Sequence, residues 1–119
     1  MISDETFRKK EHILKSKDFR AVYNKGRSFK KSGFVLLVMP NNLTHDRLGF
    51  SISSSNIKLA VIRNRVRRLF REAYRKNKPI FKPAFDMVLV VRKNPGKGFV
   101  YEKARSIFLA LAKEAEVLS

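Results

Sequence analysis

The spacing of hydrophobic residues along the chain predicts three helices. Between residues 58 and 77, apolar side chains recur every three or four positions, as they do in an amphipathic helix. Residues 101–118 repeat this spacing. A shorter segment of the same kind begins at Ser16, whose hydroxyl can cap a helix, and it stops at Gly26, a common helix terminator.

Other segments carry the pattern of strands. Residues 34–39 form a short apolar run rich in β-branched and aromatic side chains, and residues 48–53 alternate between apolar and small polar side chains. Residues 85–92 alternate in the same way, and a weaker strand signal lies at residues 28–30. We expect residues 34–39 and 48–53 to form an antiparallel hairpin whose second face, small and hydroxylated, is open to a polar ligand.

The element order is therefore α-β-β-β-α-β-α, which indicates an α+β two-layer sandwich with a sheet of about four strands. No repeat or linker divides the chain, so residues 1–119 are expected to form a single domain. Residues 1–15 are rich in charge and poorly patterned, and we expect them to be a mobile basic arm.

Composition adds a strong preference for an anionic partner. The 119 residues include 27 Lys and Arg against 10 Asp and Glu, which gives a net charge of +17. A hydrophobic content of 44% excludes a disordered tail, and the absence of cysteine excludes disulfides and thiolate chemistry. No apolar run approaches the roughly 20 residues of a membrane span, and no signal peptide is evident, so a cytoplasmic location is expected.

The helix predicted at residues 58–77 separates core-facing from basic positions. At 100° per residue, one stripe is apolar (Ile62, Val66, Leu69, Phe70 and Ala73), and the opposite arc is almost entirely basic (Arg63, Asn64, Arg67, Arg68, Arg71 and Arg75). Arg65 lies at the edge of the apolar stripe. Like charges spaced by four residues repel one another, so this arc is expected to face phosphates rather than water, an anionic membrane or an acidic protein. Flanking strands argue against a helix-turn-helix, and the aromatic residues favour single-stranded RNA.

Candidate catalytic groups are few. His12 and His45 have no second ligand at helical spacing, the acidic residues are scattered, and no glycine-rich phosphate loop is present. We predict no catalytic residue and no metal ligand in this chain. The residues by themselves describe a binding protein.

The segment Ala60–Glu72, with its Arg-Asn-Arg core followed by a basic pair and a further arginine, resembles the protein subunit of bacterial ribonuclease P. Residues 17–26 resemble the first helix of that family, residues 47–51 its third strand, and residues 86–91 its last strand. The resemblance implies a subunit that assists a catalytic RNA in removing the 5′ leader of precursor tRNA. It also implies a left-handed β-α-β crossover, whereas general chirality rules predict a right-handed one.

The resemblance further implies which residues touch RNA. Contacts to the RNA subunit fall on the arginine helix and the residue before it (Lys58, Arg63, Asn64, Arg65, Arg67, Arg68 and Arg71), and contacts to the leader fall on the first helix and the sheet (Phe19, Tyr23, Ser51 and Ser53). From the pattern alone, Phe19 and Tyr23 would be core residues. Magnesium is expected in the holoenzyme with the RNA subunit, and no cofactor is expected on the chain alone.

Some departures and alternatives remain open. Family members commonly carry a Lys-Lys pair and a glycine before the arginine motif, but residues 53–56 here are Ser-Ser-Ser-Asn, which leaves Lys58 as the basic candidate. A ribosomal or RNA-assembly protein that binds structured RNA without processing it would carry a similar surface. A peripheral membrane protein is disfavoured, because the apolar stripe of the arginine helix has only the width of an ordinary core face.

Overall fold

A computed structural model describes residues 12–13 and 16–119 of the chain. Its elements follow the order predicted from the sequence, and within the described residues they comprise three α-helices, four strands and a 3-10 turn. In chain order they are α1 (Ser16–Lys25), β1 (Arg27–Lys31), β2 (Phe34–Pro40), β3 (Arg47–Ile52), α2 (Ala60–Asn77), the 3-10 turn Lys78–Ile80, β4 (Phe85–Val91) and α3 (Tyr101–Glu114). The α+β class is confirmed, and so is the strand at residues 28–30, which extends to both sides.

The sheet has the strand order β1-β2-β4-β3, and this corrects one prediction. β2 and β3 do not form a hairpin: β4 lies between them, antiparallel to β2 and parallel to β3. β4 is buried on both faces, since Val88 and Val90 contact one cluster and Met87 and Leu89 contact the other. A strand that is apolar on both sides gains most at the centre of a sheet, whereas β3, with Gly49 on one face, suits an edge.

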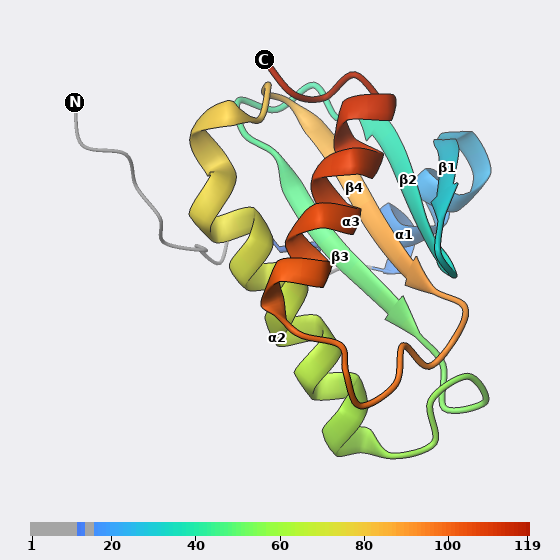
Figure 1. The fold of residues 1–119 in the computed structure, drawn as a ribbon. Helices are drawn as coiled ribbons and strands as arrows, with labels where there is room; N and C mark the ends of the chain where they lie inside the picture. Colours follow the sequence, from blue (N-terminus) through green and yellow to red (C-terminus); the bar gives the residue numbers. More distant parts are fainter. Residues whose placement is uncertain (1–11, 14–15) are drawn as a thin grey trace.

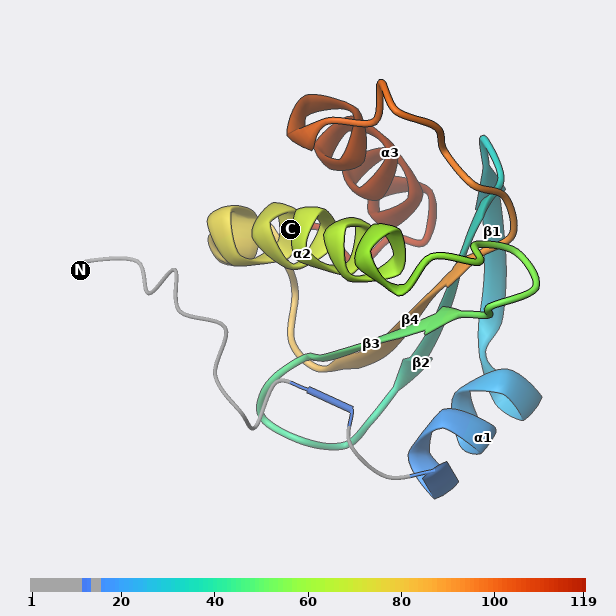
Figure 2. The ribbon, with the colours of Figure 1, turned by 90° about the horizontal axis from the view of Figure 1, so that it is seen from below.

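Two apolar clusters lie on opposite faces of the sheet. The larger lies between the sheet and the layer formed by α2 and α3, and includes Leu36, Leu89 and Phe108. The smaller lies between the sheet and α1, and includes Val22 and Val88. Figures 1 and 2 show α2 and α3 together on one side of the sheet and α1 alone on the other. The basic helix α2 and the aromatic residues of α1 therefore lie on opposite sides of the sheet.

The connection from β3 through α2 to β4 is left-handed. In Figure 1, β3 runs downward, α2 returns upward in front of the sheet, and β4 runs downward again to the right of β3. This path has the hand implied by the family resemblance and opposite to the general rule for parallel strands. It places the N-terminal end of α2 next to the carboxyl ends of β3 and β4.

The last helix ends earlier than its hydrophobic spacing predicts. The pattern continues to Leu118, but α3 stops at Glu114, and Glu116 adopts a left-handed backbone conformation with φ 60°. The N–H of Val117 donates to the carbonyl of Ala112 and that of Glu116 to the carbonyl of Lys113, which is a Schellman motif. Leu118 then bridges to Phe81 instead of continuing the helix. Glycine usually occupies the left-handed position of this motif, and here the residue is Glu116. The sequence therefore gives no signal that the helix ends at this point.

The segment expected to be a mobile arm lies mostly outside the described residues. Within it, His12 bridges to Leu48 of β3, and Ile13 is buried in the cluster under α1. These two residues belong to the packed domain. None of the helices in the described residues is long and apolar enough to cross a membrane.

Candidate RNA-binding interface

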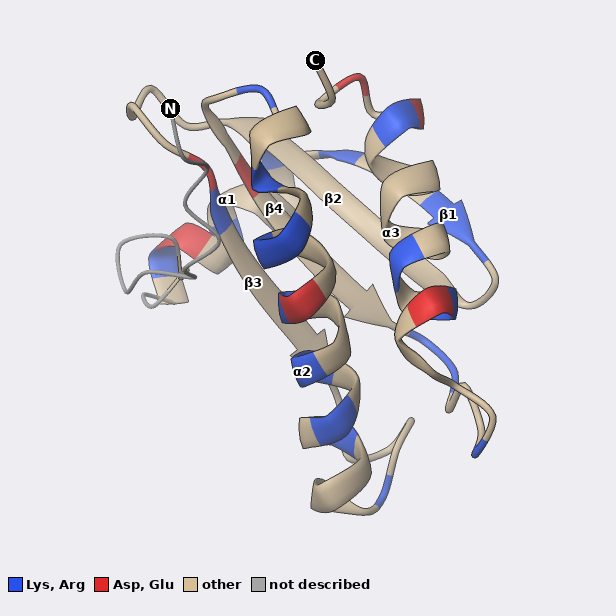
Figure 3. Ribbon diagram, turned by 60° about the vertical axis from the view of Figure 1, so that its left-hand side comes forward, with Lys and Arg blue, Asp and Glu red and all other residues tan. Residues whose placement is uncertain are grey.

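Helix α2 turns its apolar stripe inward, as the spacing predicts. Val66, Phe70 and Ala73 are buried, together with Tyr74, and Ile62 and Leu69 pack at the margin. The ring centroid of Phe70 lies 5.1 Å from that of Phe34 and 5.7 Å from that of Phe99, and these contacts fix the rotation of the helix about its axis. Figure 3 shows Lys and Arg at positions along the whole length of α2, with Glu72 as the one acidic residue of this helix.

The first motif arginine stabilises the loop that precedes α2. The Arg63 Nη1 atom donates to the carbonyl oxygens of Ile57 at 2.7 Å and Lys58 at 3.0 Å. Leu59 provides no side-chain cap for the helix, and Arg63 instead ties this turn to the helix. The exposed Lys58 side chain therefore sits on a fixed backbone beside the basic surface.

Two further arginines are held by neutral partners. The Arg67 Nη1 atom donates to the Asn64 side-chain oxygen at 2.9 Å, and the Arg71 guanidinium lies 5.6 Å from the ring centroid of Phe50 on β3. Partial burial lowers the pKa of Arg67 below its ordinary value, and the charges of Arg71 and Arg63 lower it further. Arginine nonetheless stays protonated at neutral pH, so this flank of α2 stores like-charge repulsion that an anion would relieve.

Arg65 and Arg68 make no ion pair with any described acidic side chain. They line a groove of about 470 Å³ along α2 together with Val61, Ile62, Asn64 and Arg71. The one acid of the helix, Glu72, is occupied by Arg75, whose Nη2 lies 2.7 Å from its carboxylate. The hydrogen bond from Arg75 lowers the pKa of Glu72. The guanidinium groups of Arg65 and Arg68 are therefore available to bind an anionic ligand.

On the opposite face, α1 carries the aromatic residues assigned to the leader. Phe19 is half-buried and packs against the smaller cluster, directly over Gly49. A β-carbon at Gly49 would lie 2.8 Å from Phe19 Cζ, so the Phe19 ring in this position leaves no room for a side chain at residue 49. Tyr23, one turn later, is 46% exposed. The pattern-based prediction of a core position thus holds for the inner part of Phe19 and is wrong for Tyr23.

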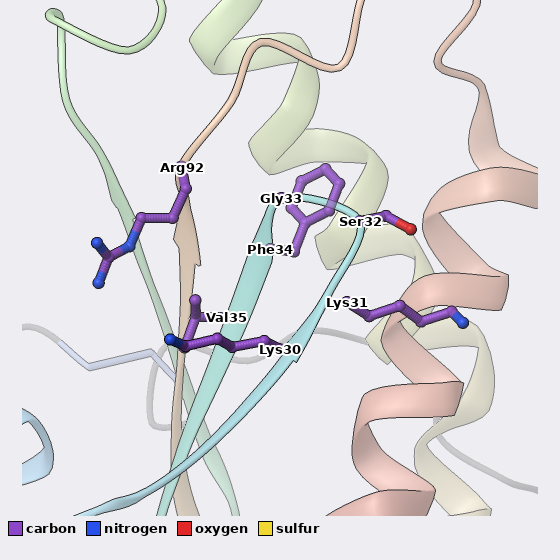
Figure 4. A pocket seen from close by; sticks show the side chains of 7 residues that line it. All are labelled: Lys30, Lys31, Ser32, Gly33, Phe34, Val35 and Arg92. Carbon is purple, nitrogen blue, oxygen red and sulfur yellow. The ribbon is translucent and has the colours of Figure 1, made fainter.

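A row of paired residues crosses this face of the sheet. Ser51 on β3 pairs with Val90, Val90 with Val35, and Val35 with Lys30 on β1. A pocket of about 300 Å³ lies at the β1–β2 turn, and in Figure 4 Lys30, Val35 and Arg92 project to the same side of it. Sequence analysis missed these two basic residues because it assigned β3 the wrong partner strand.

Ser53, the last residue assigned to the leader, lies beyond the end of β3 and is exposed. Its hydroxyl is 2.8 Å from that of Ser55, and it accepts a hydrogen bond from the Asn56 N–H at 3.3 Å. The serine-rich stretch is thus a turn closed by its own side chains. The Asn56 side chain donates to the carbonyl of Val91, which holds this turn against β4.

A charged network fixes the position of α1. Arg47 on β3 donates to both carboxylate oxygens of Asp86 on β4, at 2.8 and 2.6 Å, and lies 3.4 Å from Asp18 on α1. The Asn41 side chain also donates to Asp86. The hydrogen bond with Asp86 raises the pKa of Arg47. Sequence analysis gave no sign of this network, because its members are far apart in the chain.

Among the described residues, Asp46 and Asp86 are the buried acidic side chains. Within the part of the chain that the structure describes, no group of three or more His, Cys, Asp or Glu side chains could hold a metal ion. The buried Asp46 accepts a hydrogen bond from the Phe85 N–H, and Asp86 is engaged by Arg47.

Comparisons with known proteins agree with the motif and the fold. A family model described as Ribonuclease P matches residues 7–113. A ribonuclease P protein component from Alkaliphilus metalliredigens is 36% identical over 107 residues, which span 90% of this chain and 95% of that protein. Another from Petrotoga mobilis is 32% identical over 115 residues, 94% of this chain and 97% of that protein.

Solved structures show the same fold. The RNase P protein of Staphylococcus aureus superposes with a TM-score of 0.80 at 30% identity, covering 92% of this chain and 98% of that one. The RNase P protein from Thermotoga maritima superposes with a TM-score of 0.79 at 28% identity, covering 87% and 96%. Sequence, motif and fold agree over nearly the whole length, and the chain belongs to the ribonuclease P protein family.

Proposed function

We propose that this chain is the protein component of a bacterial ribonuclease P that binds the catalytic RNA subunit through α2 and the 5′ leader of precursor tRNA through α1 and the sheet. Membership of the family makes it a component of a ribonucleoprotein endoribonuclease of tRNA processing. The finer assignment is supported by one observation above all, the row of outward arginines on α2 whose charges no described carboxylate neutralises.

In this proposal the two faces of the protein have separate tasks. Arg65, Arg67 and Arg68 neutralise phosphates of the RNA subunit, and arginine suits this task because its planar fork can hold two phosphate oxygens. On the other face, Tyr23 offers a ring on which an unpaired base can stack. Ser51 and Lys30 offer a hydroxyl and a charge along the same row.

Hydrolysis of the phosphodiester is assigned to the RNA subunit with its magnesium. The protein brings cationic side chains to the place where two RNA molecules approach each other, and these side chains replace part of the counterion atmosphere. The protein thereby lowers the magnesium concentration needed for productive docking of the substrate. It contributes no catalytic residue.

The test is reconstitution of the chain with the RNA subunit of ribonuclease P from the same organism. We expect the protein to restore 5′ maturation of precursor tRNA at low magnesium. Arg68→Ala should require more magnesium, whereas Lys113→Ala, which removes one charge at the far end of α3, should not. No gain from the unmutated protein would reject the proposal.

The RNA that co-purifies with the chain separates this function from its alternative. A single abundant non-ribosomal RNA supports a ribonuclease P component. Ribosomal RNA would instead indicate an assembly protein with the same basic surface.

A further inference from the structure

Arg65 lines a second cleft, whose opposite wall is formed by residues outside the arginine motif. This cleft has a volume of about 320 Å³ and lies between α2 and the loop that joins β4 to α3; it is lined by Ile62, Arg65, Asn94, Gly96 and Lys97. Arg67 and Arg71 lie on the flank of α2 that faces β3, as the contact between Arg71 and Phe50 shows. Arg65 therefore points away from that flank, toward a loop whose Lys97 forms the opposite wall.

The loop is held in a defined shape. The Asn94 side-chain oxygen accepts a hydrogen bond from the Gly96 N–H at 2.9 Å, and Gly96 has a φ of 86° that favours glycine. Phe99 ends the loop in the core, where it is 3% exposed and its ring lies 5.5 Å from that of Phe34. Lys97 is thus presented by a segment anchored two residues later, with little conformational freedom to lose on binding.

The charges of this cleft have no partner in the described chain. Residues 92–98 contain Arg92, Lys93 and Lys97 and no acidic residue. Neither Arg65 nor Lys97 makes an ion pair or hydrogen bond with a described side chain. Two cations on opposite walls of one cleft repel each other unless an anion lies between them.

The cleft adjoins the groove along α2. Ile62 and Arg65 line both, and the groove continues to Arg68 and Arg71. An RNA strand that lies in the groove can place its next phosphate between α2 and the loop. We propose that Arg65 and Lys97 form a clamp for one backbone phosphate of the RNA bound by α2, a contact made by a loop outside the arginine motif.

This inference rests on the proposed function and is tested by binding of the RNA subunit over a series of salt concentrations. Each phosphate contact contributes roughly 0.7–0.9 to the slope of log affinity against log salt. Lys97→Ala should reduce the slope by about that amount and should weaken binding roughly five- to eightfold at 0.1 M salt. Lys97 is exposed, so its substitution should leave urea unfolding unchanged, and Lys113→Ala supplies the control for the loss of one distant charge.

The double variant tests the shared phosphate. If Arg65 and Lys97 hold one phosphate, Arg65→Ala and Lys97→Ala together should weaken binding by less than the product of the two single effects. A full product, or a Lys97→Ala variant that behaves like Lys113→Ala, would overturn the clamp. If the unmutated protein does not bind the RNA subunit, the proposed function itself fails. If Arg68→Ala weakens binding and Lys97→Ala does not, only the clamp fails.

Discussion

Replacement of Asp86 by alanine should destabilise the fold by about 3 kcal/mol. The Asp86 side chain is 1% exposed and accepts two hydrogen bonds from Arg47 and one from Asn41. Loss of one partner from a buried ion pair costs roughly 3–5 kcal/mol, because the other charge stays buried without compensation. The lower end applies here, since Arg47 retains 20% exposure and can turn to water and to Asp18.

Urea denaturation followed by circular dichroism measures this loss. With an m-value of about 1.5 kcal/mol/M, a loss of 3 kcal/mol moves the midpoint down by about 2 M. The melting temperature should fall by roughly 12 °C, at about 4 °C per kcal/mol for a chain of this size. Glu114→Ala, which removes an exposed carboxylate from α3, should change the stability by less than about 0.5 kcal/mol.

A double-mutant cycle tests the cause. Arg47→Met removes the partner cation, so the double variant Asp86→Ala/Arg47→Met should lose about 2 kcal/mol less stability than the sum of the two single losses. Simple additivity would show that the two residues act independently. A stability of Asp86→Ala within about 0.5 kcal/mol of the unmutated protein would refute the argument from burial altogether.

The remaining predictions concern α1, the face of the sheet beneath it, and α2. Gly49→Ala should force Phe19 outward and cost about 1–3 kcal/mol of stability, and unfolding at the unmutated midpoint would contradict the packing of α1 described above. Tyr23→Ala should weaken binding of leader-bearing precursor tRNA by roughly 1–3 kcal/mol without changing binding of mature tRNA, and equal losses for both would remove Tyr23 from the leader site. Because Arg75 lowers the pKa of Glu72, this carboxylate stabilises the fold above its unfolded pKa, and the contribution disappears as the pH falls through the lower, folded value. Glu72→Gln should therefore cost a few tenths of a kcal/mol in urea unfolding at pH 7 and nothing near pH 2, whereas a cost that grows on acidification would reverse the sign of the argument.

Local patterns in the sequence were sufficient to predict the order of the helices and strands and the basic side of α2. The 3.6-residue period of α2 separates its apolar and basic positions without knowledge of any contact, so the core stripe at Val66, Phe70 and Ala73 could be predicted. The pattern also determines that Arg68 faces away from the core. Strand alternation equally determines which side chains of β3 share a face.

Partners in space were decided only by the tertiary structure. Alternation determines the faces of a strand but not its neighbours, so the insertion of β4 between β2 and β3 was missed, and with it the row from Ser51 to Lys30. For the same reason, the sequence could not predict that Lys97 and Arg65 line one cleft. They are 32 residues apart in the sequence, and their proximity depends on how α2 and the loop after β4 pack over one sheet. Contacts of this kind arise from the burial of both clusters at once, a property of the whole chain and not of any segment.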